Sequence, residues 1–419
     1  MKTLLAEANR VPLAQQIEEV VMSTPVVDIH THLYDPAFKE LLLWGLDDLL
    51  VYHYLVAEVF RYITIPFTQF WEMSKTAQAD LIWQELFLKH SPISEACRGV
   101  LTTLHLLGLD VKKRDLPALR HWFAQQRVGA HLTRCMELAG VSRIYMTNSP
   151  FDELERPIWE KGFRRDARFI AGLRIDPLLL NWTETARRLA AWGYKVTSSA
   201  SSQKTFDQVR RFLANWTKRM EARYVMVSLQ ADFQLPAKAM TTQLIEKAVL
   251  PHCREFGLPF ALMPGVRRAA NPQLRLAGDG VGLSNMEVLQ TLCAQYPDNK
   301  FMATILAREN QHEACVLARK FRNLHLFGCW WFNNIPYLVN ELTRMRIELL
   351  GLSFTPQHSD ARVLDQIVYK WRHSRRIIAD ALVDKYSELA NTGWQVSQKE
   401  IERDVAGLFG GAFEEFCTS

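Results

Sequence analysis

The stretch VVDIHTHL (Val26–Leu33) decides the fold. Its β-branched apolar start is typical of a strand. Alternate residues of a strand point to the same face, so His30 and His32 project side by side while Ile29 and Thr31 face the other way. Two neighbouring imidazoles can hold one metal ion, but two polar residues at a strand end have the same pattern. The rest of the chain has to distinguish these two interpretations.

Seven further short apolar runs follow, and longer segments with helical periodicity separate them. The runs are SRIYMTN from Ser142, RFIAGLRI from Arg168, RYVMVSLQ from Arg223, LPFALMPG from Leu258, KFMATILA from Lys300, NLHLFGC from Asn323 and LSFTPQHSD from Leu352. Helices are expected at 241–257, 284–296 and 309–321. Eight strands that alternate with helices predict a parallel sheet, and eight repeats close best as a (β/α)8 barrel of the TIM type. An open doubly wound sheet is the alternative.

The spacing of the runs also predicts how the chain is organised. About a hundred residues separate the first two strands, which is too long for a loop. This stretch is rich in Leu, Trp and Phe at helical spacing, so residues 37–138 are expected to form a mostly helical insertion that covers the active-site mouth. The barrel itself is expected over 25–376, with an N-terminal helical segment at 1–24 and C-terminal helices at 377–419.

Composition narrows the class of protein. The 419 residues are 48% hydrophobic and carry a net charge of +5, with basic and acidic residues interspersed. This pattern gives little support for nucleic-acid binding and suits a small anionic substrate. Seven scattered cysteines argue against a disulfide framework. No run has the length of a membrane span or the pattern of a signal peptide, so a cytoplasmic protein is expected, and a homo-oligomer is compatible with the sequence.

Polar residues end several of the runs. In a barrel of this kind the active site forms at the carboxyl ends of the strands, and the first and eighth strands are neighbours. The residues at these ends are His30, His32, Asn148, Arg174, Asp176, His358, Asp360 and Arg362. His30, His32 and Asp360 together suit one divalent ion such as zinc. The alternatives are a helix cap for Asp360 and surface ion pairs for the arginines.

Several ordered stretches resemble one family within the amidohydrolase superfamily, the uronate isomerases. They are HYLVAEVFR from His53, MTNSP from Met146, LRIDP from Leu173, GCWWFNN from Gly328 and HSDAR from His358. Their order matches the family's HYKWR, TTDDP, FRPD, GWWFND and LTDSRS segments. The resemblance runs from about Val26 to Arg376 and implies a barrel enzyme that isomerises hexuronates, such as D-glucuronate to D-fructuronate or D-galacturonate to D-tagaturonate.

The resemblance also implies roles for individual residues. The metal ligands fall on His30, His32 and Asp360. The catalytic set comprises Asp360, Tyr54 and His53, and the substrate-binding set comprises Arg174, Arg362, Trp331 and Trp330. The chain departs from the family at Ala261 and Met263, where the family has Gln and His on the fifth strand, and at Asn148 and Ser149, where it has paired aspartates. These departures mark the chain as a divergent member.

Isomerisation through an enediol needs a base, a proton donor and stabilisation of an oxyanion. Asp360 is the best candidate base, and Arg174 or Arg362 can hold a sugar carboxylate in a bidentate fork. A metal-dependent hydrolase acting on a small acidic substrate is the alternative, and a sugar-acid binder without activity is a third. A hydrolase usually recruits further ligands from the middle strands, and none is present in the fourth to sixth runs.

Overall fold

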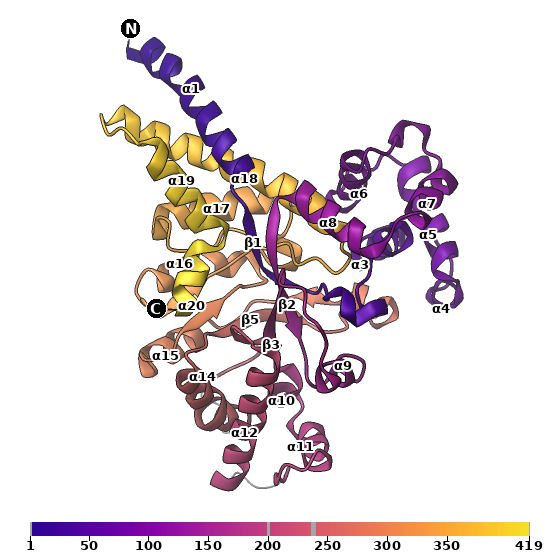
Figure 1. The fold of residues 1–419 in the computed structure, drawn as a ribbon, viewed down its shortest axis with the longest axis vertical. Coiled ribbons are helices and arrows are strands. Elements are labelled where there is room, and N and C mark those ends of the chain that lie inside the picture. Colours follow the sequence, from indigo (N-terminus) through magenta and orange to yellow (C-terminus); the bar gives the residue numbers. More distant parts are fainter. Residues whose placement is uncertain (1, 199–201, 236–239, 419) are drawn as a thin grey trace.

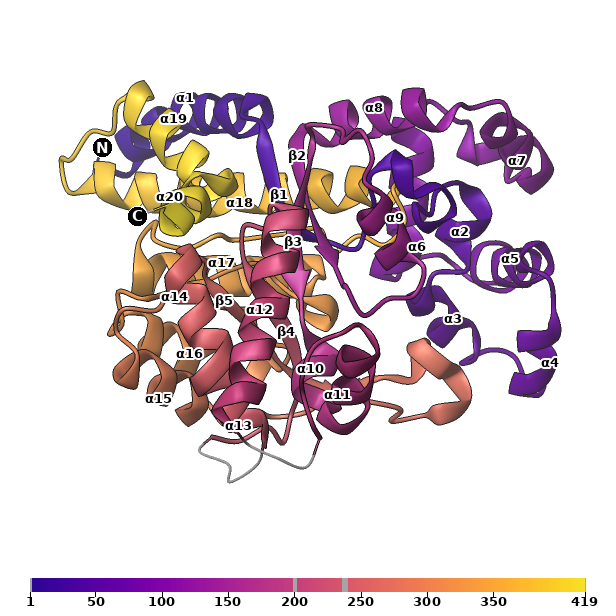
Figure 2. The same cartoon turned by 60° about the horizontal axis from the view of Figure 1, so that its bottom comes forward.

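The computed structural model describes residues 2–198, 202–235 and 240–418. Its centre is a curled sheet with the strand order β1-β2-β3-β4-β5-β7-β8, and β6 pairs with β5 (Figures 1 and 2). The strands are β1 (Val26–Thr31), β2 (Val141–Asn148), β3 (Phe169–Arg174), β4 (Val225–Gln230), β5 (Phe260–Arg267), β6 (Gly280–Val281), β7 (Phe301–Ala303) and β8 (Leu324–Leu326). All pairings are parallel except that of β6 with β5. The predicted α/β class with a parallel sheet is therefore confirmed.

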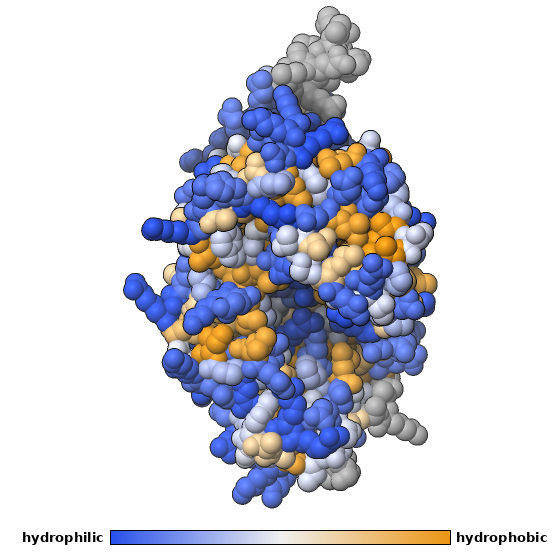
Figure 3. Space-filling view, turned by 90° about the vertical axis from the view of Figure 1, so that its right-hand side faces the viewer, coloured by the Kyte–Doolittle hydropathy of each residue, from blue (hydrophilic) through white to orange (hydrophobic). Residues whose placement is uncertain are grey.

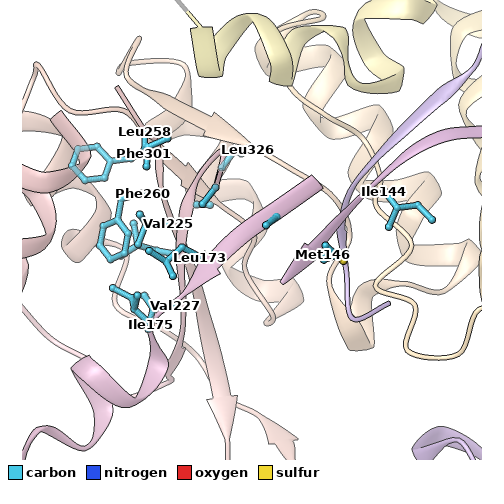
Figure 4. Packing of buried hydrophobic residues seen from close by; sticks show 14 of the residues in the cluster. Ile144, Met146, Leu173, Ile175, Val225, Val227, Leu258, Phe260, Phe301 and Leu326 are labelled. Atoms are coloured by element: carbon cyan, nitrogen blue, oxygen red, sulfur yellow. The ribbon is translucent and has the colours of Figure 1, made fainter. Parts of the chain in front are cut away.

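Both faces of the sheet are buried, as expected for parallel strands covered by helices. Leu173, Val225 and Phe260 sit beside one another on three paired strands and belong to the cluster between sheet and helices (Figure 4). Their strand neighbours Met226 and Ala261 belong to a different cluster on the inner face of the curl. The apolar runs were continuous, not alternating, because each strand is covered on both sides.

The eighth predicted run, at 352–360, is not a regular strand. Only Thr355 forms a bridge, with Phe327, and the amide of Asp360 donates to the carbonyl of His30 at 3.2 Å. Pro356 has no amide hydrogen to donate, and Asp360 has a φ of 53°, which is outside the extended region. The run nevertheless touches β8 through Thr355 and β1 through Asp360, so it lies between the two edges of the sheet.

The chain between β1 and β2 is helical, and we call it the helical segment (36–139). Its elements are η1 (Pro36–Leu41), α2 (Leu46–Leu50), α3 (His53–Val59), α4 (Phe67–Glu72), α5 (Lys75–Trp83), η2 (Gln84–Lys89), α6 (Glu95–Leu106), η3 (Val111–Lys113), α7 (Leu116–Ala124) and α8 (Val128–Ala139). Much of this segment has a hydrophobic cluster of its own, which includes Phe70, Trp83 and Leu104. In Figures 1 and 2 the helices α3 to α7 lie together to one side of the sheet.

Further helices connect the later strands. They are α9 (Glu155–Lys161), α10 (Asp176–Leu180), α11 (Trp182–Ala191), α12 (Gln203–Met220), α13 (Met240–Leu244), η4 (Ile245–Val249), α14 (Leu250–Phe256), η5 (Pro272–Gly278), α15 (Glu287–Gln295), η6 (Arg308–Asn310), α16 (Gln311–Ala318), η7 (Trp331–Asn333) and α17 (Pro336–Leu350). The helices expected at 241–257, 284–296 and 309–321 correspond to α13 to α14, α15 and α16. The hairpin of β5, η5 and β6 was not expected, because its sequence VRRAANPQLRLAGDGV carries no clear period.

The two ends of the chain lie together, because the first helix packs against helices of the C-terminal part. The terminal elements are α1 (Lys2–Ser23), α18 (Gln366–Asn391), α19 (Gln398–Ala406), η8 (Gly407–Gly411) and α20 (Ala412–Thr418). Position 376, expected as the end of the barrel, lies inside α18, which continues through it. The ring of Phe413 on α20 packs inside the curl against Tyr145 and Tyr224, with ring centroids 5.1 and 6.1 Å away.

Two general properties complete the description. All seven cysteines lie in the described part of the chain, none forms a disulfide, and six are buried. Among the helices of the described ranges, none combines the length and the apolar character that crossing a membrane requires.

Candidate active site

His30, His32 and Asp360 meet at the carboxyl end of β1. The Nε2 atoms of His30 and His32 lie 3.6 and 3.5 Å from Oδ1 of Asp360. The two imidazoles project from the same face at the end of β1, as their spacing predicts. Asp360 lies beside them because its amide donates to the carbonyl of His30. One ligand atom from each of the three residues lies within 4.8 Å of the others. The sequence prediction that these three side chains converge is therefore correct.

The donor atoms fit a divalent metal ion. Both ring nitrogens of His30 and Oδ1 of Asp360 are buried without a hydrogen-bond partner among the described residues, a costly arrangement unless a ligand satisfies them. The hydroxyl of Thr147 donates to the carbonyl of Thr31 at 2.9 Å, so it must accept from Nδ1 of His32, 3.1 Å away. Nε2 of His32 then keeps its lone pair on the side of Asp360, as a metal ligand requires.

Electrostatics keep both imidazoles neutral. Burial lowers the pKa of His30 well below its ordinary value, and the nearby His358 lowers it further. Burial lowers the pKa of His32 in the same way, followed by the positive charge of Arg362. A neutral imidazole is the form that binds metal, so these shifts favour ligation at neutral pH.

Asp360 sits on a backbone that holds it in an unusual conformation. Its φ of 53° lies in the left-handed region, which Asp and Asn tolerate better than most residues. The residue before it, Ser359, is held by a buried carboxylate: Asp28 accepts from the amide of Ser359 at 3.0 Å. Asp28 also accepts from the indole of Trp371 at 2.8 Å. Burial raises the pKa of Asp28 to about 6. Asp28 belongs to the opening motif but was not singled out from the sequence.

A pocket of about 430 Å³ opens above these three residues. Its walls are formed by His30, His32, Tyr52, His53, Arg174, Ser228, Arg268, Leu276, Trp330, Trp331, Asp360 and Arg362. Figure 3 views the molecule from the side of the helical segment and shows a hollow near its centre with hydrophilic residues in its depth.

The two predicted arginines both line the pocket but differ in their partners. Arg174 is held by Asp176, with Nε and Nη2 at 2.7 and 2.5 Å from the same carboxylate oxygen. Asp176 also accepts from the amide of Ser228 at 2.9 Å. The guanidinium of Arg362 has no hydrogen-bond or ion-pair partner within the described ranges and faces the pocket. Arg362 is thus the cation with its donors free for an incoming anion.

The predicted pair His53 and Tyr54 is placed differently by the structure. His53 begins α3 and lines the pocket, with its ring 5.8 Å from that of Trp331 and its Nε2 buried and unpaired. Tyr54 is not among the lining residues and packs against Tyr52 at 4.9 Å and Phe332 at 6.5 Å. Tyr52 lines the pocket instead. Burial raises the pKa of both phenols far above neutrality, so each keeps its proton.

Other lining residues were not foreseen. Arg268 and Leu276 reach the pocket from the β5–β6 hairpin, which also docks on the helical segment through Trp71, whose indole donates to the carbonyl of Gln273 at 2.8 Å. Ser228 lies within β4. The hairpin sequence has no strand period, so it gave no signal that Arg268 and Leu276 reach the pocket. Trp330 and Trp331 line the pocket as predicted.

A second, wider pocket of about 890 Å³ shares His32, Arg174 and Arg362 with the first. Its wall includes Glu155, which is buried and accepts from the hydroxyl of Tyr34 at 2.8 Å. Asn148 and Ser149, which replace the family's paired aspartates at the end of β2, both contact this carboxyl group. The Asn148 amide and the Ser149 backbone amide each donate to Oε2 of Glu155 at 3.0 Å.

Fold and site together define an α/β protein with a candidate metal centre at the carboxyl ends of its strands. Comparisons with family models and with curated proteins each gave no match. Among solved structures, the chain is similar to a uronate isomerase from Bacillus halodurans at 50% identity and a TM-score of 0.96, with 98% of this chain and 97% of the other covered. The chain belongs to the uronate isomerase family and is an enzyme.

Two more distant structures share the fold. A uronate isomerase from Thermotoga maritima has 14% identity and a TM-score of 0.78, with 97% of each chain covered. A glucuronate isomerase from Caulobacter crescentus has 16% identity and a TM-score of 0.67, with 98% of this chain and 94% of the other covered. These two likenesses concern the fold alone.

Proposed function

We propose that the protein interconverts the aldose and ketose forms of a hexuronate, of the D-glucuronate to D-fructuronate or D-galacturonate to D-tagaturonate type. The observation that carries this proposal is the 50% identity to the Bacillus halodurans uronate isomerase over nearly the whole of both chains. The chemistry of the pocket agrees with it, because the free guanidinium of Arg362 and the candidate base Asp360 line the same pocket.

The metal centre of this proposal is His30, His32 and Asp360. We propose zinc as the ion, because neutral imidazole and carboxylate suit it. A divalent ion held there would polarise an oxygen of the substrate. The middle strands add no further donors on the inner face, where Ala261 and Met263 are buried among apolar side chains. Their apolar character favours an isomerase over a metal-dependent hydrolase, which needs additional ligands at this place.

In the proposed reaction the carboxylate of Asp360 removes the proton from C2 and returns it to C1, while the proton of the C2 hydroxyl passes to the oxygen on C1. The substrate carboxylate is bound by Arg362, whose fork is free, while Arg174 is oriented by Asp176 toward the same space. His53 faces the pocket and donates to a sugar hydroxyl. Tyr54 does not line the pocket, so its predicted catalytic role would have to act through Tyr52, which lines the pocket and whose ring lies 4.9 Å from that of Tyr54.

Trp330 and Trp331 form one wall of the proposed substrate site. Trp331 has a φ of 49° and stacks on Phe332 at 5.0 Å, so its ring is fixed as it lines the pocket. A flat apolar wall excludes water from the bound sugar and strengthens the charge-assisted contacts to Arg362.

We also propose that the sheet closes as a (β/α)8 barrel, with the run at 352–360 in the eighth place. The contacts of Thr355 with β8 and of Asp360 with β1 support this closure. In this arrangement the barrel covers 25–376, the mostly helical insertion at 37–138 covers its mouth, and the terminal parts are 1–24 and 377–419. The separate hydrophobic cluster of the helical segment supports its treatment as an insertion.

The experiment is incubation of the metal-loaded protein with a panel of hexuronates, followed by detection of the ketose. Wild type should form a ketose, and in deuterated water the product should carry solvent deuterium at C1. Arg362→Lys keeps the charge but loses the fork, so it should raise KM for the acid sugar much more than it lowers kcat. A protein that left every hexuronate unchanged but hydrolysed an amide or ester with the same metal dependence would disprove the isomerase proposal.

A further inference from the structure

Arg362 occupies the middle of a short segment, 360–365, that is attached at both ends. At the first end the amide of Asp360 donates to the carbonyl of His30, and the amide of His32 donates to the carbonyl of Ala361 at 2.8 Å. This end is therefore tied to the strand that carries two of the metal ligands. The position of Arg362 relative to the metal centre depends on what holds the other end.

The other end is attached to the helical segment. Val363 forms a parallel bridge with Leu43, and the amide of Leu364 donates to the carbonyl of Leu43 at 2.9 Å. Just beyond the 360–365 segment, Oε1 of Gln366 accepts from the amides of Arg362 and Val363 at 2.9 and 3.1 Å. The backbone of Arg362 is thus held by partners that sit on both sides of it.

Asp365 is the point at which three parts of the helical segment converge. Its carboxylate accepts from Nε2 of His131 at 2.7 Å and from the amide of Gly45 at 2.7 Å, and its carbonyl accepts from the hydroxyl of Thr103 at 3.3 Å. Asp365, His131 and Thr103 are fully or almost fully buried. Gly45 has a φ of 98°, which a residue with a side chain rarely adopts. A buried carboxylate is costly unless such donors satisfy it.

His131 is itself enclosed, with the rings of Trp44, Phe123 and Trp122 at 5.4, 5.7 and 6.0 Å. Together with Cys135 and Asp365 it forms a group whose ligand atoms lie within 4.8 Å of one another. The hydrogen bond between His131 and Asp365 already uses the atoms that a metal ion would need, and Gly45 uses the second oxygen of Asp365. A role as a hydrogen-bonded anchor therefore fits this group better than a metal site.

We infer that the buried pair His131 and Asp365 are positioning residues for substrate binding: they fix the far end of the 360–365 segment and thereby place Arg362 for the carboxylate of an acid sugar. This inference rests on the proposed function. The pair touches neither pocket, so it acts on the substrate only through Arg362. The helical segment, in this view, does more than cover the site, because it sets the orientation of one of its binding groups.

The test compares His131→Phe with His131→Gln. Phenylalanine keeps a ring in the aromatic enclosure but removes the donor to Asp365, whereas glutamine keeps a side-chain N–H. His131→Phe should raise KM for the hexuronate by about tenfold or more, in the range of one charge-assisted hydrogen bond, with kcat changed by less than about threefold. His131→Gln should restore most of the lost affinity. Metal content should stay equal to that of wild type in both variants.

Phe70→Leu is the control for a general loss of stability. Phe70 lies in the core of the helical segment and does not line the pocket. A KM as high as that of His131→Phe in this variant would overturn the inference, and so would an unchanged KM in His131→Phe. If His131→Phe does not fold, Thr103→Val decides, because it removes only the bond to the carbonyl of Asp365: a KM raised about twofold or more supports the inference, and an unchanged KM overturns it.

A binding measurement separates this inference from the proposed function. D-gluconate is a sugar acid that cannot isomerise, and sorbitol is its neutral counterpart. Calorimetry with both ligands measures how much the binding of a carboxylate by Arg362 contributes to affinity, without turnover. Weaker binding of D-gluconate to His131→Phe than to wild type, with sorbitol unaffected, supports the positioning role even in a protein that converts no hexuronate. Turnover of hexuronates by wild type with equal D-gluconate binding in both proteins overturns the positioning role alone.

Discussion

Glu155→Gln should make the protein more stable than wild type above neutral pH. Burial raises the pKa of Glu155 from 4.5 to about 7, against the lowering effect of hydrogen bonds from Asn148, Tyr34 and Ser149. Between these two pH values the folded protein keeps a proton that the unfolded chain has released. The stabilisation from this group is therefore fully present below the unfolded pKa and is lost as pH rises through about 7.

The size of the effect follows from the shift. A change from 4.5 to about 7 corresponds to about 3 kcal/mol of unfolding free energy that wild type loses across this interval. Glutamine reproduces the protonated acid, because its carbonyl can accept from Asn148 and from the amide of Ser149 while its amide donates to the oxygen of Tyr34. It has no charge to desolvate at high pH, so its stability should depend much less on pH.

Urea unfolding at pH 5 and at pH 8 measures this difference directly. Between these values wild type should lose about 2.5 kcal/mol more than the variant, because pH 5 already lies above the unfolded pKa. Glu153→Gln is the matched control, because Glu153 is exposed in the turn just before α9 and its replacement should leave the pH dependence of wild type unchanged. Identical pH dependence in wild type and Glu155→Gln would show that Glu155 is charged in the folded protein and that the reasoning about its burial is wrong.

Three further outcomes are expected at the metal centre and the pocket. The double variant His30→Ala/His32→Ala should retain less than about a tenth of the metal of wild type by elemental analysis, and equal metal content would remove the assignment. Asp360→Asn suits the positive φ, so it should fold normally, while kcat falls by about 10²- to 10⁴-fold; activity near that of wild type would exclude Asp360 as the base. Tyr52→Phe should impair turnover more than Tyr54→Phe does at equal melting temperature, because only Tyr52 lines the pocket, and the reverse order would restore the prediction made from the sequence.

The sequence predicts those parts of the fold and site that depend on local pattern. His30 and His32 share a face because every second residue of a strand does, and the β-branched runs identify the strands that are buried on both faces. Asp360 was placed next to them correctly because the parallel order brings the first and last runs together. The conformation of Asp360 was not predictable in this way, since Pro356 and long-range hydrogen bonds determine where the last run leaves the strand geometry.

The parts that were missed depend on contacts between distant segments. Tyr52 and Tyr54 are two residues apart at the start of one short helix, and the choice between them depends on how α3 packs at the pocket, which the local sequence pattern does not indicate. Arg268 and Leu276 enter the pocket only because the β5–β6 hairpin docks on the helical segment. Such residues carry no signal in a single sequence other than their charge or apolar character.

The ring of Phe413 has a consequence for the order in which this protein is made. It fills the inside of the curled sheet beside Tyr145 and Tyr224, yet it follows every strand along the chain. A ribosome has therefore released all the strands before the residue that completes their interior emerges, and until then a nascent chain exposes an apolar hollow. Chaperone capture should be greatest at this late stage of synthesis, and a chain stopped before residue 412 should stay chaperone-bound although His30, His32, Arg174, Asp360 and Arg362 are all present.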